Sequence, residues 1–235
     1  MQPPKKCYWC GAPAKSVDHV PPKNLFPDGK KVNLITVPSC WKHNEDFTKN
    51  DELFRNYIQL CADSPDSLRL FKEKTLPSLE SPKARGLLNK TFKGFALTTL
   101  GGKQIATSQV DPKQQNLYFE KITRGLFFHI FKRHIQSEIT TVSPQFKLPN
   151  LDTVAFCKTF EKYTEHPNAI DGIVGQPEIF RYRYYHEILE AHEMFFVMMT
   201  FYDFIKVFGF FDESTSNQEM VADASGSRSN PNDPQ

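Results

Sequence analysis

Two pairs of potential metal ligands restrict what the N-terminal part of this chain can fold into. Cys7 and Cys10 are separated by two residues and followed by a glycine, and Cys40 and His43 repeat the same spacing further along. Two thiolates on a tight turn can hold one ion, and a second pair completes a set of four ligands. Three thiolates and one imidazole suit a structural zinc ion. The sequence therefore predicts that one Zn²⁺ joins these two pairs.

Composition points to a folded protein of 235 residues. The hydrophobic fraction is 39%, with 21 Phe, which is enough for a substantial core. No stretch of 18 apolar residues occurs, so we expect no membrane span. The N-terminus lacks the apolar segment of a secretion signal. Because the five cysteines are odd in number, they fit a reducing compartment, and we expect a cytoplasmic protein.

The charges are unevenly distributed along the chain. Residues 1–136 hold 22 Lys and Arg against 12 Asp and Glu, a net charge of +10, whereas residues 137–235 hold 7 against 15, a net charge of −8. A basic half of this kind suits a polyanion, and an acidic half suits a protein partner. We therefore expect the first half to contact nucleic acid and the second half to dock a protein partner.

Periodicity and turn residues predict an α+β chain. Residues 15–20 and 31–38 resemble two short strands around a Pro/Gly-rich stretch, and residues 39–61 have helical spacing. Further on we expect helical pieces broken at Pro77 and Pro82, and a hairpin over 95–112 that turns at a Gly pair. The later expectations are helices at 115–135 and 152–163, strands at 178–185 and 194–204, and a solvated helix at 186–193.

These patterns divide the chain into three parts. Residues 1–62 form the zinc-stapled module, and residues 63–211 form a mixed helical and strand region with an accessory role. Residues 212–235 are polar and are expected to be a disordered tail.

Chemistry-bearing residues lie between the two ligand pairs and just after them. Asp18 and His19 are near the end of the first predicted strand, and Asn44 directly follows His43. Neighbours on a strand face opposite ways, but near a strand end both side chains can reach one site. Carboxylate and carboxamide oxygens suit Mg²⁺ or Mn²⁺, and a histidine beside such an ion can take a proton from water near neutral pH.

The order of these residues resembles a known family. "DHVPP" after a CxxC pair, followed by "NLITVPSCWKHN", is similar to the motif of HNH nucleases, whose ββα-metal fold is treble-clef-like. The resemblance spans roughly residues 7–58. It implies that Asp18 and Asn44 hold a catalytic Mg²⁺ or Mn²⁺, that His19 is the general base, and that Asn33 holds the hairpin and orients the base. The chain departs from many members in having His43 rather than cysteine, and Asn44 rather than histidine.

What the resemblance implies for function is metal-dependent hydrolysis of DNA. His19 would activate water, and the ion would stabilise charge on the phosphate. Eight basic residues are expected to contact duplex DNA, four near the motif and four on the predicted helix 115–135: Lys23, Lys30, Lys31, Lys49, Lys121, Arg124, Lys132 and Arg133. By analogy alone, such a nuclease with a long partner region suits a mobile-element or anti-phage defence effector.

Two other functions remain open from the sequence. The chain could be a non-catalytic, zinc-stapled nucleic-acid binder, although Asp18, His19 and Asn44 are all present. It could also be an interaction protein that docks a partner through its acidic half, which is compatible with nuclease activity.

Overall fold

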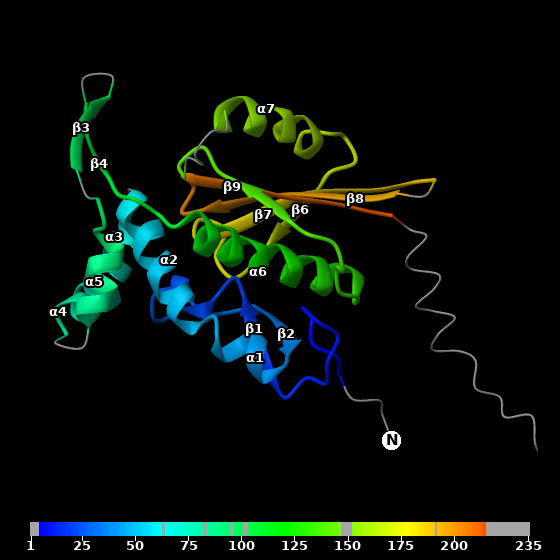
Figure 1. Cartoon of the computed structure of the whole chain (residues 1–235), viewed down its shortest axis with the longest axis horizontal. Coiled ribbons are helices and arrows are strands. Elements are labelled where there is room, and N and C mark those ends of the chain that lie inside the picture. Colours follow the sequence, from blue (N-terminus) through cyan, green and yellow to red (C-terminus); the bar gives the residue numbers. More distant parts are fainter. Residues whose placement is uncertain are drawn as a thin grey trace, which may run out of the picture.

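The computed structural model describes residues 5–62, 64–81, 84–94, 96–100, 103–146, 152–190 and 192–214, and it is a mixed α+β protein (Figure 1). The strands of these residues form three antiparallel sheets. Two are two-stranded hairpins, and the third has five strands in the order β5-β9-β8-β7-β6.

The N-terminal module is a hairpin followed by two helices, where the sequence predicts two strands and one helical stretch over 39–61. Strand β1 (Ser16–Val20) pairs with β2 (Ile35–Ser39), so that His19 lies opposite Thr36. A short 3-10 helix, η1 (Lys23–Leu25), follows β1, and helices α1 (Trp41–Glu45) and α2 (Thr48–Cys61) follow β2. The Cys40–His43 pair therefore lies where β2 ends and α1 begins.

A helical segment and a second hairpin come next. Helix α3 (Pro65–Leu70) runs directly into the π-helical segment η2 (Phe71–Thr75) and then into α4 (Leu76–Glu80). The expected break at Pro77 is wrong, because the chain stays helical from α3 through α4, and Pro77 comes just after the π-helical segment, where the α-helical hydrogen-bond pattern is already interrupted. After α5 (Arg85–Thr91) the predicted hairpin is present as β3 (Ala96–Leu100) and β4 (Lys103–Thr107). Pro82 and the Gly pair of the turn lie outside the described residues.

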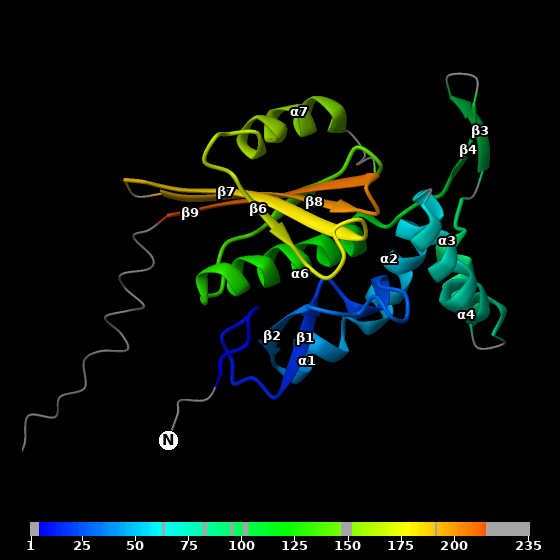
Figure 2. The same cartoon turned by 180° about the vertical axis from the view of Figure 1, so that it is seen from behind.

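Helix α6 (Pro112–Phe131) is the central element of the fold. It is covered on one side by the N-terminal module and on the other by the five-stranded sheet, as both views show (Figures 1 and 2). It ends at Lys132, which has a left-handed backbone (φ 59°), somewhat earlier than the predicted residue 135. Because both sides are covered, nearly every residue from Tyr118 to Phe127 is buried.

The five-stranded sheet is sandwiched between α6 and α7 (Thr153–Thr164) (Figure 2). Along β8 (His192–Phe201), Phe195 and Val197 belong to the core under α6, whereas Phe196 packs under α7. A strand covered on both faces needs apolar residues at successive positions, which explains the run "MFFVMMTF". The remaining strands are β5 (Thr140–Val142), β6 (Ile170–Ile173), β7 (Phe180–Leu189) and β9 (Ile205–Ser214).

The C-terminal half agrees with the sequence in some elements and differs in others. The predicted helix 152–163 and both predicted strands are confirmed as α7, β7 and β8. Residues 186–193 were expected as a helix, which is wrong: of these, 186–189 belong to β7 and 192–193 to β8, and His186 lies opposite Phe195. The expected disordered tail starts too early, because Asp212–Ser214 belong to β9. The rest of that tail, 215–235, lies outside the described residues.

One hydrophobic core joins the N-terminal module to the central helix and the sheet. It includes Phe54 of α2, Phe119 of α6 and Phe201 of β8. The predicted division after residue 62 stays a prediction, and the structure shows that the core is continuous across it. Among the described helices, none combines the length and apolar character needed to cross a bilayer.

Candidate functional site

The four predicted zinc ligands lie together in space. The ligand atoms of Cys7, Cys10, Cys40 and His43 are all within 4.8 Å of one another. The Sγ atoms of Cys10 and Cys40 are 3.9 Å apart, and His43 Nδ1 lies 3.7 Å from Cys7 Sγ and 3.3 Å from Cys40 Sγ. Ligands of a tetrahedral zinc ion are separated by about 3.4–3.8 Å, given the usual Zn–S and Zn–N bond lengths. The cluster therefore fits a metal such as zinc.

The electrostatics of the cluster favour cation binding. Burial alone would raise the pKa of Cys7, but backbone N–H groups of Cys40, Cys10 and Trp9 outweigh it and lower that pKa. The pKa of Cys10 is raised, first by burial and also by the nearby Cys7. Burial, together with Lys42 and Arg124, lowers the pKa of His43 and keeps its imidazole neutral. The effect of Cys7 on Cys10 means that the two thiolates would repel each other. A metal ion bound to the thiolates and to a neutral imidazole would relieve this repulsion.

Aromatic rings fix the cluster against the rest of the fold. Trp9 stacks on the His43 ring, with centroids 5.2 Å apart and an interplanar angle of 18°, and the Arg124 guanidinium of α6 lies 4.9 Å from the Trp9 ring centroid. Arg124 is buried, and it also donates to the carbonyls of Ile135 and Ser137. The cluster of four potential metal ligands is thus connected to α6 through the Trp9 ring and the Arg124 guanidinium.

Asp18 and His19 project from opposite faces of β1. Asp18 is buried toward α6, whereas His19 is half-buried on the outer face that also carries the exposed Val17. The expectation that both side chains reach one site is not met, because His19 is inside the paired strand, where alternation holds. Their one recorded hydrogen bond is from the His19 backbone N–H to Asp18 Oδ1, at 2.8 Å.

Asp18 belongs to a buried ion-pair cluster. Its Oδ2 lies 3.1 Å from Lys121 Nζ and accepts a hydrogen bond from the Tyr8 hydroxyl at 3.3 Å. Lys121 is 1% exposed and also pairs with Asp51 Oδ2 at 2.7 Å. Burial raises the pKa of Asp51 to about 6, although Lys121 opposes this shift.

The catalytic divalent ion that the resemblance implies does not fit Asp18 as it is placed here. Both carboxylate oxygens already have partners, and the nearest cation is an ammonium group of the chain itself. A divalent ion would have to share a buried oxygen with Lys121, against charge repulsion. Among the described residues, the Cys7–Cys10–Cys40–His43 cluster is the only group of three or more His, Cys, Asp or Glu side chains placed to share an ion.

The two predicted asparagines have structural contacts. Asn44 of α1 donates from Nδ2 to the Ser16 hydroxyl at 3.0 Å and to the Val17 carbonyl at 3.4 Å, which ties α1 to β1. Asn33 precedes β2 with a left-handed backbone (φ 53°), and its carbonyl accepts the N–H of Gly175 at 3.3 Å. Asn33 therefore connects the hairpin loop to the loop before β7.

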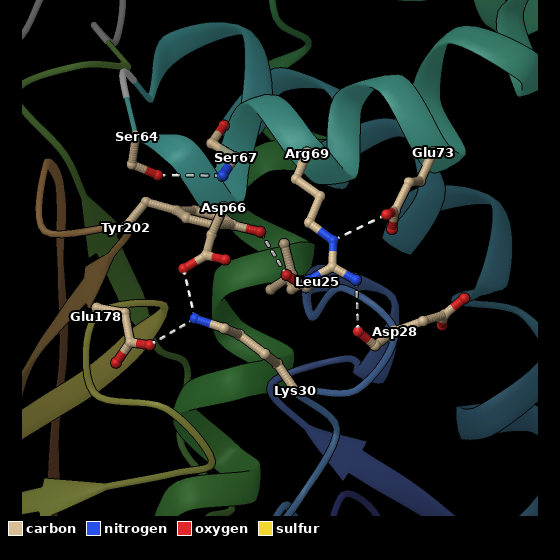
Figure 3. A network of polar contacts seen from close by, with 10 residues as sticks. All are labelled: Leu25, Asp28, Lys30, Ser64, Asp66, Ser67, Arg69, Glu73, Glu178 and Tyr202. Carbon is tan, nitrogen blue, oxygen red and sulfur yellow. Dashed lines mark hydrogen bonds and ion pairs between the residues drawn. The ribbon is translucent and has the colours of Figure 1, made fainter.

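The basic residues near the motif fall into two groups. Lys30 is paired with Asp66 at 2.7 Å and Glu178 at 2.9 Å (Figure 3). Lys31 is paired with Asp28. The ion pairs of Lys30 hold the hairpin loop against α3 and the loop before β7. Lys23 and Lys49 are exposed, and within the described part of the chain no ion pair is recorded for either.

The basic face expected on helix 115–135 is wrong for its central members. Lys121 and Arg124 are buried between the module and the sheet, where they bind carboxylates and carbonyls. Arg133 pairs with the buried Glu193, and only Lys132 of these four is exposed. Amphipathic spacing does not distinguish a solvated basic stripe from charges buried under a second layer.

Comparisons with known proteins give no independent guide to this site. No protein-family model matches the chain, and no curated protein or solved structure matches it either.

Tyr8 and Asp51 are members of the site that the sequence did not predict, and Lys121 was expected to contact DNA instead. Tyr8 and Asp51 contact the Asp18 carboxylate or its ammonium partner, and Lys121 links both carboxylates. Nothing in the sequence around Asp51, near the start of α2, indicates that its carboxylate pairs with Lys121. Only the packing of α6 across β1 brings Lys121 to Asp18.

Proposed function

We propose that this protein is a zinc-stapled nuclease that hydrolyses phosphodiester bonds of DNA, with His19 as the general base. The observation that supports the proposal is the placement of His19 on the outer face of a hairpin whose base is closed by the metal cluster. An imidazole on a rigid element, accessible from solvent, is what a general base requires.

The charge state of His19 suits this role. Partial burial lowers the pKa of His19, and Lys23 and Lys121 lower it further, against the opposing effect of Asp18. A neutral imidazole is therefore the dominant form near pH 7, ready to accept a proton from water. The exposed Lys23, close enough to influence His19, offers a positive charge to a phosphate.

The rest of the module holds this face in place. Asn44 ties α1 to the same strand through Val17, and the Asp18 carboxylate accepts the His19 backbone N–H from the opposite face. Zn²⁺ in the cluster would supply structural closure only, because all its donor positions are protein side chains. Since Asp18 does not fit a divalent ion in this arrangement, no step here depends on one.

Cleavage of supercoiled plasmid by zinc-loaded protein tests the proposal, with and without added Mg²⁺ or Mn²⁺. His19→Ala should lower the cleavage rate by about 10²–10⁴-fold, the usual contribution of a general base, and should leave DNA affinity within about twofold. His192→Ala is the matched control, because His192 is exposed on the β7–β8 hairpin and pairs with Asp212.

One outcome would refute the assignment of His19, and another would refute the nuclease itself. If His19→Ala cuts at the parent rate, His19 is not the base. If the zinc-loaded parent binds DNA but cuts neither DNA nor RNA under any of these conditions, the chain is the non-catalytic zinc-stapled binder. The second candidate is favoured by the same observation that argues against a divalent ion, namely that Asp18 is engaged inside the fold.

A further inference from the structure

Lys121 is the centre of a buried cluster of charged side chains that includes Asp18 and Asp51. Lys121 projects from α6 into the interface with β1 and is almost fully buried. Its ammonium contacts Asp18 at 3.1 Å and Asp51 at 2.7 Å, and it lies 5.3 Å from the centroid of the Phe47 ring. A lysine ammonium has three donors, and two carboxylates and an aromatic face surround this one.

The cluster requires a cation at this place. Isolated buried carboxylates are costly, so Asp18 and Asp51 cannot both remain charged in the interface without a positive partner. Asp51 Oδ1 is buried with no hydrogen-bond partner among the described residues. With two acids and one ammonium, the cluster has more negative than positive charge when all three groups are ionised.

We propose that the Lys121 ammonium is the resident cation of Asp18, so that Asp18 ligates no divalent ion while Lys121 is in place. This deepens the proposed function, since it concerns the carboxylate behind the proposed base. Lys121 becomes a positioning residue: it holds Asp18 Oδ2, and Asp18 Oδ1 accepts the backbone N–H of His19.

Geometry and charge explain why the Lys121 ammonium and a divalent ion exclude each other at Asp18. A magnesium or manganese ion binds a carboxylate oxygen at about 2.1 Å and keeps several waters. Asp18 Oδ2 already receives the Lys121 ammonium and the Tyr8 hydroxyl in a buried interface. There, two like charges a few ångströms apart would be weakly screened. Removing the ammonium should leave Asp18 and Asp51 as an unneutralised pair with affinity for a divalent ion.

Mn²⁺ binding to the zinc-loaded full chain, followed by the electron paramagnetic resonance signal of free Mn²⁺, tests this directly. The parent and Asp18→Asn should bind Mn²⁺ equally. Lys121→Met, which keeps the aliphatic stem, should gain one site at least tenfold tighter than any in the parent. The double variant Lys121→Met with Asp18→Asn should lose that site, and Lys121→Arg, which keeps the charge, should behave as the parent does. Zinc content is measured throughout, so that exchange at the cysteine cluster is not counted.

Two results would overturn the proposal: Mn²⁺ binding by the parent that weakens tenfold in Asp18→Asn, or a folded Lys121→Met with no new site. If Lys121→Met does not fold, the comparison of the parent with Asp18→Asn still decides. Failure of the proposed function is distinguishable, because the absence of DNA cleavage changes none of these Mn²⁺ titrations.

Discussion

The close approach of α6 to β1 allows a sharp test of the packing that places Lys121 beside Asp18. Gly125 lies one helical turn after Lys121 on α6. A Cβ added at Gly125 would lie 2.4 Å from Val20 Cγ2 and 3.0 Å from Val20 Cγ1. Carbon atoms prefer separations of about 3.5–4.0 Å, and Val20 is fully buried, so it has no room to turn away. Gly125→Ala therefore has to push α6 away from the hairpin.

The magnitude follows from two opposing effects. Alanine in a helix interior is favoured over glycine by about 1 kcal/mol. Overpacking a well-filled core costs about 1–3 kcal/mol, and an overlap of more than 1 Å belongs at the upper end of that range. We therefore expect the free energy of unfolding of Gly125→Ala to fall by about 1–2 kcal/mol, measured by urea denaturation of the zinc-loaded protein.

The same substitution elsewhere is the matched control. Gly86, in the first turn of α5, has nothing within 4 Å of an added Cβ. Gly86→Ala should therefore be neutral or stabilising, by up to about 1 kcal/mol.

Val20→Ala identifies the contact. Alone it removes about two buried methylene equivalents and should cost about 2 kcal/mol. Combined with Gly125→Ala it should cost less than the sum of the two single changes, by about 1–2 kcal/mol. Strict additivity, or a Gly125→Ala variant as stable as the parent, would refute the reasoning.

Three further outcomes can be measured on the same protein. Cys10→Ser should lose the bound zinc and lower the melting temperature by about 6–12 °C, as expected for a loss of about 3 kcal/mol in a chain of this size, whereas Cys61→Ser, outside the cluster, should keep one zinc by elemental analysis. The pKa of Asp51 is raised to about 6 in the fold against 3.8 as its ordinary value. Between pH 4 and 6 the Asp51 carboxyl is therefore protonated in the folded chain and ionised in the unfolded chain. Because of this difference, the free energy of unfolding should fall by up to about 3 kcal/mol as pH rises from 4 to 6. Asp51→Asn should flatten that part of the stability profile, and an unchanged profile would contradict the assignment. Reversing the exposed Lys23 and Lys49 to Glu should reduce the salt dependence of DNA affinity by about one unit per lost phosphate contact. Reversing Lys206, which pairs with Glu161 of α7, should leave the slope unchanged.

Local sequence patterns were sufficient to predict those parts of the structure whose signal lies within short stretches of the chain. The spacing of Cys7, Cys10, Cys40 and His43 predicted the metal cluster, because four ligands of the right type in two short pairs are rarely grouped for another reason. The hairpin before α1 and the helix over 112–131 were also predictable, since turn residues and helical periodicity act over a few residues. At 186–193 the helical interpretation failed, because the pairing of β7 with β8 determines the structure of that segment.

Only the tertiary structure decided which charged side chains are buried and which face solvent. In the sequence, Lys121 and Arg124 belong to a basic helix, and Asp18 is half of an Asp-His motif. The packing of the hairpin on one side of α6 and the sheet on the other buries both cations and turns Asp18 inward, away from His19. Burial of a charge depends on which elements meet across the core, and no periodicity within one segment records that. The sequence by itself determined the cluster of four potential metal ligands and the strand that carries His19, whereas the fold determined that the cation beside Asp18 comes from the chain itself.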